Sequence, residues 1–227
     1  MAVIFITGID TNSGKTIATG LLARYLHKNN KTVITQKLVQ TGCEKMSEDI
    51  LLHRKLMGME LFEDDKNNLT CPYIFKYPAS PHLSARLEQK TIDIDIIDEA
   101  TYKLSRKFET VLLEGAGGIY VPLTDNFTVL DYIETRNYPI ILVSSAKLGS
   151  INHTLLTLDA IKNRDLDVIG IIFNEFPKQE KEIIRDTRDV FERYISQYWF
   201  NAAIIDIPIL EGDSIPDINF GKFFYNE

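Results

Sequence analysis

Cysteine is scarce in this sequence, and its scarcity excludes two kinds of structural support. Only Cys43 and Cys71 occur among the 227 residues, with 27 residues between them. A disulfide framework needs several paired cysteines, and a thiolate metal cluster needs cysteines at short spacing. We therefore expect two free thiols.

Long apolar runs and clustered positive charge are lacking as well. No apolar stretch approaches the roughly 18 residues that a membrane-spanning helix needs, and the first residues read as a strand, with no charged region or cleavage site before it. The net charge is −7 and the Lys and Arg residues are scattered, whereas general nucleic-acid binders cluster basic side chains to neutralise phosphates. We expect a cytoplasmic protein with no nucleic-acid or membrane partner.

The chain does have enough apolar material for a large core. It is 44% hydrophobic over 227 residues, and open α/β sheets of this size form one domain. No internal repeat or low-complexity linker interrupts it. We expect residues 1–227 to form a single domain.

The most specific motif is the segment from Gly8 to Thr16, which reads Gly-Ile-Asp-Thr-Asn-Ser-Gly-Lys-Thr. An apolar run, Ala2 to Thr7, precedes it, and a helical apolar pattern starts after it. Glycines let backbone N–H groups approach phosphate oxygens, Lys15 reaches the outer phosphates, and the Thr16 hydroxyl can hold Mg²⁺. This context favours a phosphate-binding loop over a chance Gly-Lys-Thr on a surface turn, although the loop has one residue more than the common pattern.

Strand-like and helix-like runs alternate along the chain, which indicates parallel βαβ units. The sequence predicts an α/β fold of the P-loop NTPase class, with a mostly parallel sheet covered by helices on both faces. The stretch from Gly58 to Gln89 is the least periodic and should be a long excursion over the site. The expected strands are Ala2–Thr7, Thr32–Gln36, Thr110–Glu114, Pro139–Ser144, Val168–Asn174 and Ala203–Ile207; the expected helices are Lys15–Asn29, Ser47–Met57, Asp93–Lys107, Ile151–Arg164 and Lys178–Ile195.

Ligands of open parallel sheets bind beyond the carboxyl ends of the strands. Besides the loop, four segments take that position and should face one crevice: Lys37–Gly42, Glu114–Gly118, Ala146–His153 and Asn174. Glu114 ends an apolar strand, where a charge is costly unless it coordinates a metal or pairs with another charge. The strand ends therefore predict a polar site opposite the phosphates.

These segments together resemble the dethiobiotin synthetase family. The resemblance runs through most of the chain and departs at Leu38, where the family has Pro. It rests on Gly8–Thr16 with its extra loop residue, Lys37–Gly42, Ser80–His82, Glu114–Gly118, Val121–Leu123, Lys147–Asn152 with Thr154–Leu158, Asn174 and Ile207–Pro208.

The resemblance implies an enzyme that combines 7,8-diaminononanoate, CO₂ and MgATP. A substrate amine forms a carbamate, ATP phosphorylates it to a mixed anhydride, and the second amine closes a cyclic urea. The enzyme's task would be to position two anions and neutralise charge. The family also implies a homodimer in which Gly149, Ser150 and Asn152 bind the substrate carboxylate across the subunit boundary.

Carried over residue by residue, the resemblance assigns four groups of site residues. Lys37 and Lys15 would be catalytic. Thr16, Asp49 and Glu114 would hold Mg²⁺, with Asp10 behind them. The nucleotide would contact Asn12, Ser13, Gly14, Lys15, Thr16, Ile17, Asp49, Glu114, Gly115, Ala116, Gly117, Asn174, Glu175, Pro208, Ile209 and Leu210, and the substrate would contact Thr11, Lys37, Thr41, Ser80, Pro81, Gly149, Ser150 and Asn152.

Several of these residues have a simpler explanation that the sequence leaves open. Lys37 could be an exposed lysine in a solvated ion pair, Asp49 and Ser150 could be helix caps, and Asn174 could be a buried asparagine with satisfied hydrogen bonds. We interpret the four histidines as surface or packing residues, with His82 alone near expected substrate contacts: His27, His53, His82 and His153.

Two other functional classes share the loop and the fold. A partition or septum-site ATPase would carry an extra lysine early in the loop, where this chain has Ile9 and Asp10, and its membrane members end in a basic amphipathic helix, which Asp217–Glu227 is not. An amidotransferase of the cobyrinate type needs a glutaminase domain with a nucleophilic cysteine, for which 227 residues leave no room. We retain the switch ATPase as the alternative.

Overall fold

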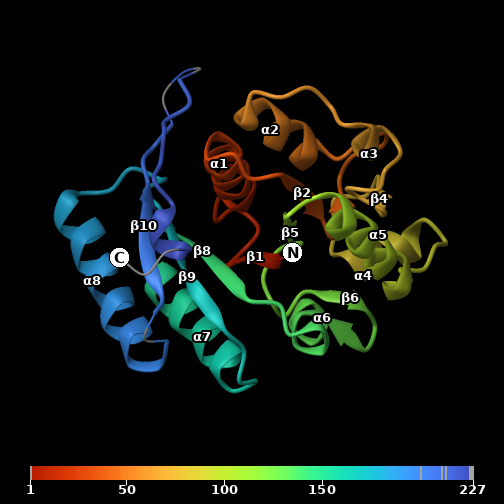
Figure 1. The fold of residues 1–227 in the computed structure, drawn as a ribbon. Coiled ribbons are helices and arrows are strands. Elements are labelled where there is room, and N and C mark those ends of the chain that lie inside the picture. The colour runs from red at the N-terminus through yellow and green to blue at the C-terminus, as the bar shows by residue number, and fades with distance from the viewer. Residues whose placement is uncertain (1, 200, 211, 213, 225–227) are drawn as a thin grey trace.

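The centre of the fold is a six-stranded sheet whose strands are all parallel, in the order β10–β9–β8–β1–β5–β2 (Figure 1). The computed structural model describes residues 2–199, 201–210, 212 and 214–224. Each strand is mostly buried, as expected when both faces of a sheet are covered. The strands are β1 (Ala2–Gly8), β2 (Val33–Lys37), β5 (Thr110–Glu114), β8 (Ile140–Ser145), β9 (Val168–Asn174) and β10 (Ala203–Ile207).

Helices cover the two faces of this sheet, and strand alternation decides which side chains they meet. Phe5 and Ile6 are neighbours on β1 and point to opposite faces. Ile6 packs in one apolar cluster with residues of α1 (Lys15–Lys28) and α2 (Glu48–Met57), whereas Phe5 packs in another. That second cluster contains residues of α5 (Ile94–Lys107), α6 (Val129–Arg136), α7 (Ser150–Lys162) and α8 (Lys181–Tyr198).

The predicted α/β fold, its six strands and its five helices are confirmed, with boundaries that shift by a few residues. The long stretch from Gly58 to Gln89 does reach the carboxyl ends of the strands. Its Ser80 and Pro81 line a cavity there, together with Lys37 and Glu114; this cavity is called the main cavity below. The stretch also contains elements that are too short to produce a readable period. These are α3 (Glu63–Lys66), β4 (Ile74–Phe75), which pairs with β3 (Gln40–Thr41), and α4 (Pro81–Leu87).

Four further elements were not predicted. The helix α6 begins with a capping box in which Thr128 and Asp131 bond reciprocally, a pattern that is readable in sequence. Before it lies a hairpin of β6 (Pro122–Thr124) and β7 (Phe127–Thr128), and a short 3₁₀ helix, η1 (Gly221–Phe223), packs near the chain end.

The strand order places a crevice at the end of β1. From β1 the chain crosses to β2 at one edge, returns through β5, and then moves to β8 on the other side of β1. Ligands of such sheets bind at this change of direction. Because all six strands are parallel, their last residues lie at the same edge of the sheet. For β1, β2, β5 and β9 these residues are Gly8, Lys37, Glu114 and Asn174.

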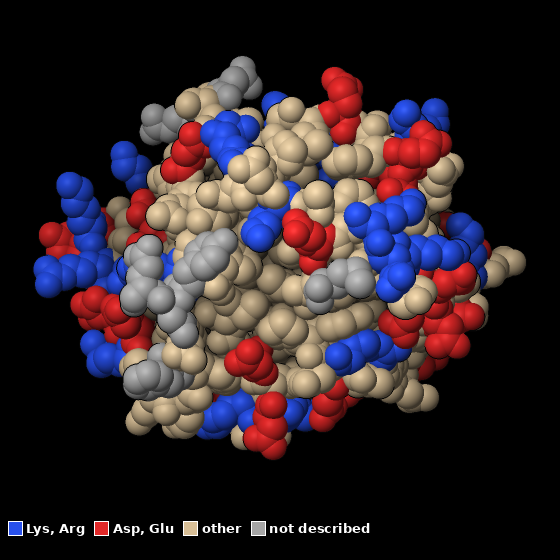
Figure 2. All heavy atoms as spheres, in the orientation of Figure 1, with Lys and Arg blue, Asp and Glu red and all other residues tan. Residues whose placement is uncertain are grey.

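Cys43 and Cys71 match the expectation of two free thiols. Figure 2 shows basic and acidic side chains next to one another over the visible face. Cys43 and Cys71 are buried and free, and burial raises the pKa of the Cys71 thiol to about 12. No helix among the described residues is both long enough and apolar enough to cross a bilayer.

Candidate active site

The loop between β1 and α1 depends on two glycines. A Cβ on Gly8 would lie 2.2 Å from Ser13 Oγ and 2.9 Å from Lys15 Cγ, so a side chain there would displace the lysine. Gly14 has φ +96° as the N-cap of α1, a conformation that favours glycine. The Lys15 ammonium folds back over the loop and donates a 2.7 Å hydrogen bond to the Asp10 carbonyl.

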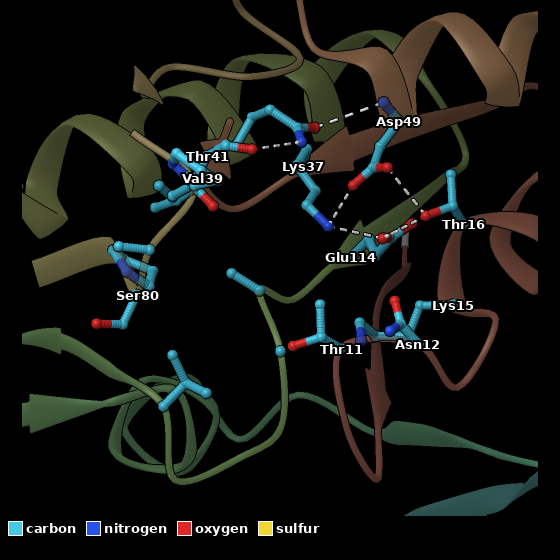
Figure 3. A pocket seen from close by; sticks show the side chains of 17 residues that line it. Thr11, Asn12, Lys15, Thr16, Lys37, Val39, Thr41, Asp49, Ser80 and Glu114 are labelled. Atoms are coloured by element: carbon cyan, nitrogen blue, oxygen red, sulfur yellow. Dashed lines mark hydrogen bonds and ion pairs between the residues drawn. The ribbon is translucent and has the colours of Figure 1, made fainter. Parts of the chain in front are cut away.

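A cluster of charges lies opposite this loop, at the ends of β2 and β5. Lys37 and Glu114 are register partners on these strands. The Lys37 ammonium lies 2.7 Å from Glu114 Oε1 and 2.6 Å from Asp49 Oδ2 (Figure 3). It also donates to the Gly115 carbonyl at 3.0 Å. Lys37 is only 5% exposed. Burial rules out the exposed, solvated ion pair that the sequence had left open for this residue.

The hydroxyl of Thr16 brings the loop into the same cluster. Its oxygen lies 3.0 Å from Asp49 Oδ1 and 3.2 Å from Glu114 Oε1. Asp49 sits in the first turn of α2, but Ser47 is the residue that caps this helix, by accepting a hydrogen bond from the Ile50 N–H. The Asp49 carboxylate is therefore available to face Lys37 and Thr16.

Burial and neighbouring charges set the protonation of these groups. Burial acts to raise the pKa of Glu114, but the Lys37 charge and a hydrogen bond from His53 outweigh it and hold the pKa well below its usual range. Burial acts to lower the pKa of Lys37, and the carboxylates of Glu114 and Asp49 raise it above its ordinary value. The pKa of Lys15 falls to about 8, through burial and the nearby Lys37 charge. The lysine and the carboxylate at the strand ends are thus both held charged.

Both predicted catalytic lysines open into one cavity of about 620 Å³. This volume lies within the roughly 300–1,000 Å³ typical of small-molecule sites. In Figure 3, Thr41 and Ser80 lie on the side of this cavity across from Thr11 and Asn12. Among the predicted residues, the cavity is lined by Thr11, Asn12, Lys15, Thr16, Lys37, Thr41, Asp49, Ser80, Pro81, Glu114, Ala116 and Gly117. The remaining lining residues were not singled out as site residues, but they fall in segments that the sequence analysis had marked: Val39, Gln40, Pro78, Ala79 and Val121.

The other predicted nucleotide residues do not line this cavity. The Asn174 amide donates to the Ser13 carbonyl at 3.2 Å and its oxygen accepts from the Phe176 N–H, while a Cβ on Gly14 would meet Asn174 Nδ2 at 2.3 Å. Asn174 therefore packs against the loop and has hydrogen-bond partners within the chain. Ser13, Gly14 and Ile17 belong to the loop and the start of α1, Gly115 follows Glu114, and Glu175, Pro208, Ile209 and Leu210 follow the paired ends of β9 and β10.

The start of α7 lies apart from the main cavity. Gly149, with φ +93°, is the N-cap of this helix, and the Ser150 hydroxyl bonds to Ser145 at 3.0 Å. Both residues line a separate hollow beside α8. Asn152 is exposed. Within one copy of the chain, the described structure does not bring these three residues to Lys37.

Our interpretation of His53 from the sequence was incomplete. This histidine is fully buried, but it also lies against the charge cluster, with Nε2 2.8 Å from Glu114 Oε2. Its position on α2 is one helical turn after Asp49, so the two side chains share a face. That i,i+4 spacing is the signal in the sequence that could have placed His53 at the site.

Comparison with known proteins agrees with this geometry. Residues 2–210 match the model of an AAA domain family. The chain is 50% identical over 196 residues to the ATP-dependent dethiobiotin synthetase BioD 2 of Pasteurella multocida, covering 86% of this chain and 92% of that protein. It is 47% identical over 206 residues to the BioD enzyme of Chlorobaculum tepidum, covering 90% and 86% of the two chains.

Solved structures with low sequence identity share only the fold. A MinC:MinD cell division complex from Aquifex aeolicus matches with a TM-score of 0.53 at 18% identity, covering 92% of this chain and 81% of that one. Chloroplast FtsY from Physcomitrella patens matches with a TM-score of 0.52 at 16% identity, covering 98% and 63%. The fold alone would leave the family open, but the extensive identity to the synthetases does not: the chain belongs to the dethiobiotin synthetase family.

Proposed function

We propose that this protein catalyses the ATP-dependent closure of a cyclic urea from 7,8-diaminononanoate and CO₂, giving dethiobiotin, ADP and phosphate. The observation that carries the proposal is the shared cavity of Lys15 and Lys37, with Thr16, Asp49 and Glu114 on its wall. Family membership supplies the substrates, and the cavity supplies one place where a terminal phosphoryl group and a second anion can meet.

The chemistry proceeds in three steps, and this arrangement suits each of them. A substrate amine attacks CO₂ and loses a proton, which forms a carbamate. A carbamate oxygen then attacks the terminal phosphorus, and the bond to the ADP oxygen breaks. Finally, the second amine attacks the carbonyl carbon and phosphate leaves. Charge builds up on oxygens in each step, so preorganised cations and N–H donors are the effective catalysts.

We assign different anions to the two lysines. Lys15 belongs to the loop and lies beside its amides, so it would hold the outer phosphates. Lys37 comes from the neighbouring strand end and would contact both the carbamate and the transferring phosphoryl oxygens. Thr41 and Ser80 lie across the cavity from the loop and would hold the diamine.

The oxygen donors of this wall fit Mg²⁺. The hydroxyl of Thr16 and the carboxylates of Asp49 and Glu114 converge from three elements, with Thr16 within 3.2 Å of both. Mg²⁺ prefers hard oxygen ligands and is held beside phosphates by one or two carboxylates. When bound, the ion would neutralise phosphate charge and polarise the phosphoryl oxygens.

We also propose a homodimer that joins through the start of α7. Leu148 and Leu156 are 93% and 60% exposed, so this segment offers apolar side chains that a second copy could cover. The partner copy would then bring Gly149, Ser150 and Asn152 toward the diamine site.

Sedimentation tests the proposed dimer. We expect the wild-type protein to give twice the 26.0 kDa mass of one chain, and the Leu148→Asp variant to give the mass of a single chain. A monomeric wild-type protein would refute the dimer.

The proposed reaction is tested with labelled bicarbonate. Purified protein supplied with ATP, Mg²⁺ and the diamine should transfer the label into dethiobiotin, and omission of either ATP or the diamine should abolish transfer. As the matching control, the rate of ATP hydrolysis is measured without the diamine, in the presence and in the absence of DNA or liposomes. Hydrolysis that rises strongly with DNA or lipid, together with no labelled product, would favour the switch ATPase instead.

Replacement of Lys37 by Gln tests the assignment of the second anion. Turnover should fall by at least about a hundredfold, the loss typical of one preorganised charge-stabilising group, while ATP affinity stays close to that of the wild type. Single-turnover kinetics and ATP titration measure the two quantities. Lys31→Gln, at an exposed position, is the matched control. Near-normal turnover in Lys37→Gln would contradict a catalytic role.

Replacement of Glu114 by Gln tests the metal assignment. The amide preserves side-chain size but removes one anionic ligand, so the Mg²⁺ concentration for half-maximal rate should rise by about tenfold or more. The rate is measured as Mg²⁺ is varied at fixed ATP, and circular dichroism checks that the variant is folded. An unchanged Mg²⁺ requirement in a folded variant would count against Glu114 as a ligand.

A further inference from the structure

His53 contacts the charge cluster from the side opposite the cavity. It lies on α2 and is fully buried. Its Nε2 lies 2.8 Å from Glu114 Oε2, while the other oxygen of that carboxylate, Oε1, lies 2.7 Å from the Lys37 ammonium and 3.2 Å from the Thr16 hydroxyl. The two oxygens of Glu114 thus have separate environments, one bonded to the histidine and one turned toward the catalytic side.

The contacts of the two ring nitrogens of His53 indicate which of them carries the hydrogen. The Thr35 hydroxyl accepts a 2.8 Å hydrogen bond from Arg54 Nη1, and it lies 3.0 Å from His53 Nδ1. A hydroxyl that accepts from the guanidinium can still donate its own hydrogen, and Nδ1 is the ring nitrogen that it meets. On the other side of the ring, the ionised Glu114 carboxylate can only accept, so Nε2 carries the hydrogen that it donates to Glu114, and Nδ1 accepts from the Thr35 hydroxyl.

A buried ion pair fixes this arrangement from behind. The Arg54 guanidinium makes two 2.8 Å bonds to the Asp65 carboxylate, and both of these side chains, like that of Thr35, are at most 3% exposed. Asp65 also accepts from the Thr70 hydroxyl at 2.7 Å, and the Thr70 carbonyl accepts from the Lys37 N–H at 2.7 Å. The network therefore starts and ends at residues of the active site.

We propose that His53 is a positioning residue: as the neutral Nε2–H tautomer it holds Glu114 Oε2, so that Oε1 alone is presented to Mg²⁺ and Lys37. This inference rests on the proposed role of Glu114 as a metal ligand. A neutral donor orients the carboxylate and leaves its negative charge for the metal and the lysine, whereas a cation at this position would compete for that charge. Loss of a group that hydrogen-bonds a metal ligand from outside commonly lowers metal affinity by about 10–100-fold.

Two substitutions of His53 separate orientation from packing. His53→Leu fills a similar space without a donor, and the Mg²⁺ concentration for half-maximal rate should rise by about tenfold or more. His53→Gln offers an amide N–H to Glu114, and the same quantity should rise by no more than roughly threefold, which rescues most of the loss. At saturating Mg²⁺ the two variants should turn over at similar rates. His27→Leu, on the exposed end of α1, is the matched control.

Two measurements that do not depend on turnover complete the test. Calorimetric titration with a non-hydrolysable ATP analogue at varied Mg²⁺ should show the same order. The Mg²⁺ concentration needed for binding should be lowest for the wild type, higher for His53→Gln and highest for His53→Leu. ¹⁵N NMR of histidine-labelled wild-type protein should show a hydrogen bonded to Nε2 of His53 and none on Nδ1. Thr35→Val removes the hydroxyl that selects this tautomer, so it should shift the NMR signature and raise the Mg²⁺ requirement.

Each outcome is decisive for one of the two proposals. If Glu114→Gln raises the Mg²⁺ requirement but a folded His53→Leu variant does not, the positioning role is wrong and the metal role stands. If Glu114→Gln has no effect, the metal role itself is wrong. A proton on Nδ1 in the wild-type protein overturns the tautomer even if the His53 variants do not fold. A Thr35→Val variant that leaves both the NMR signature and the Mg²⁺ requirement unchanged overturns the selecting role of Thr35.

Discussion

The active site depends on the burial of the Lys37 ammonium between the carboxylates of Glu114 and Asp49. A buried charge without a partner costs several kcal/mol, so each of these groups is tolerable only because the others are present. Removal of one member of a buried pair typically costs about 3–5 kcal/mol, which makes the cluster a constraint on the fold as well as a candidate for catalysis. With both lysines protonated, the two positive charges of Lys15 and Lys37 balance the two carboxylates. The charges of this cluster and of the loop lysine therefore cancel within the chain itself.

This one constraint joins parts of the chain that are distant in sequence. Lys37 and Glu114 meet because β2 pairs with β5, while Thr16 and Asp49 arrive from the first turns of α1 and α2. Behind them, His53 and the Arg54–Asp65 pair tie the cluster to α3 and to Thr70. A parallel sheet brings these elements to one edge, and close packing leaves few alternative positions for the side chains.

The comparison with known folds shows how little of this chemistry belongs to the fold. The MinC:MinD and FtsY structures share the architecture at 16–18% identity, and nothing in a parallel sheet with a phosphate loop requires a lysine at the end of β2. The site is determined by which side chains stand at the strand ends. In this chain the strand ends carry Lys37 and Glu114, and the family identity of about 50% extends over most of the sequence that holds them.

The sequence by itself determined the α/β fold and predicted the phosphate loop with Lys15, because glycine spacing and apolar periodicity are local properties of the chain. The role of Lys37 was instead implied by the resemblance to the synthetases. The sequence could not determine the role of His53, since that role depends on Glu114, 61 residues away. It also left Lys37 open between an exposed ion pair and a buried one, and only the tertiary structure decided for the buried one. The short elements between Gly58 and Gln89 escaped prediction for the same reason: two to seven residues carry too little periodicity, and their conformation comes from packing against the rest of the fold.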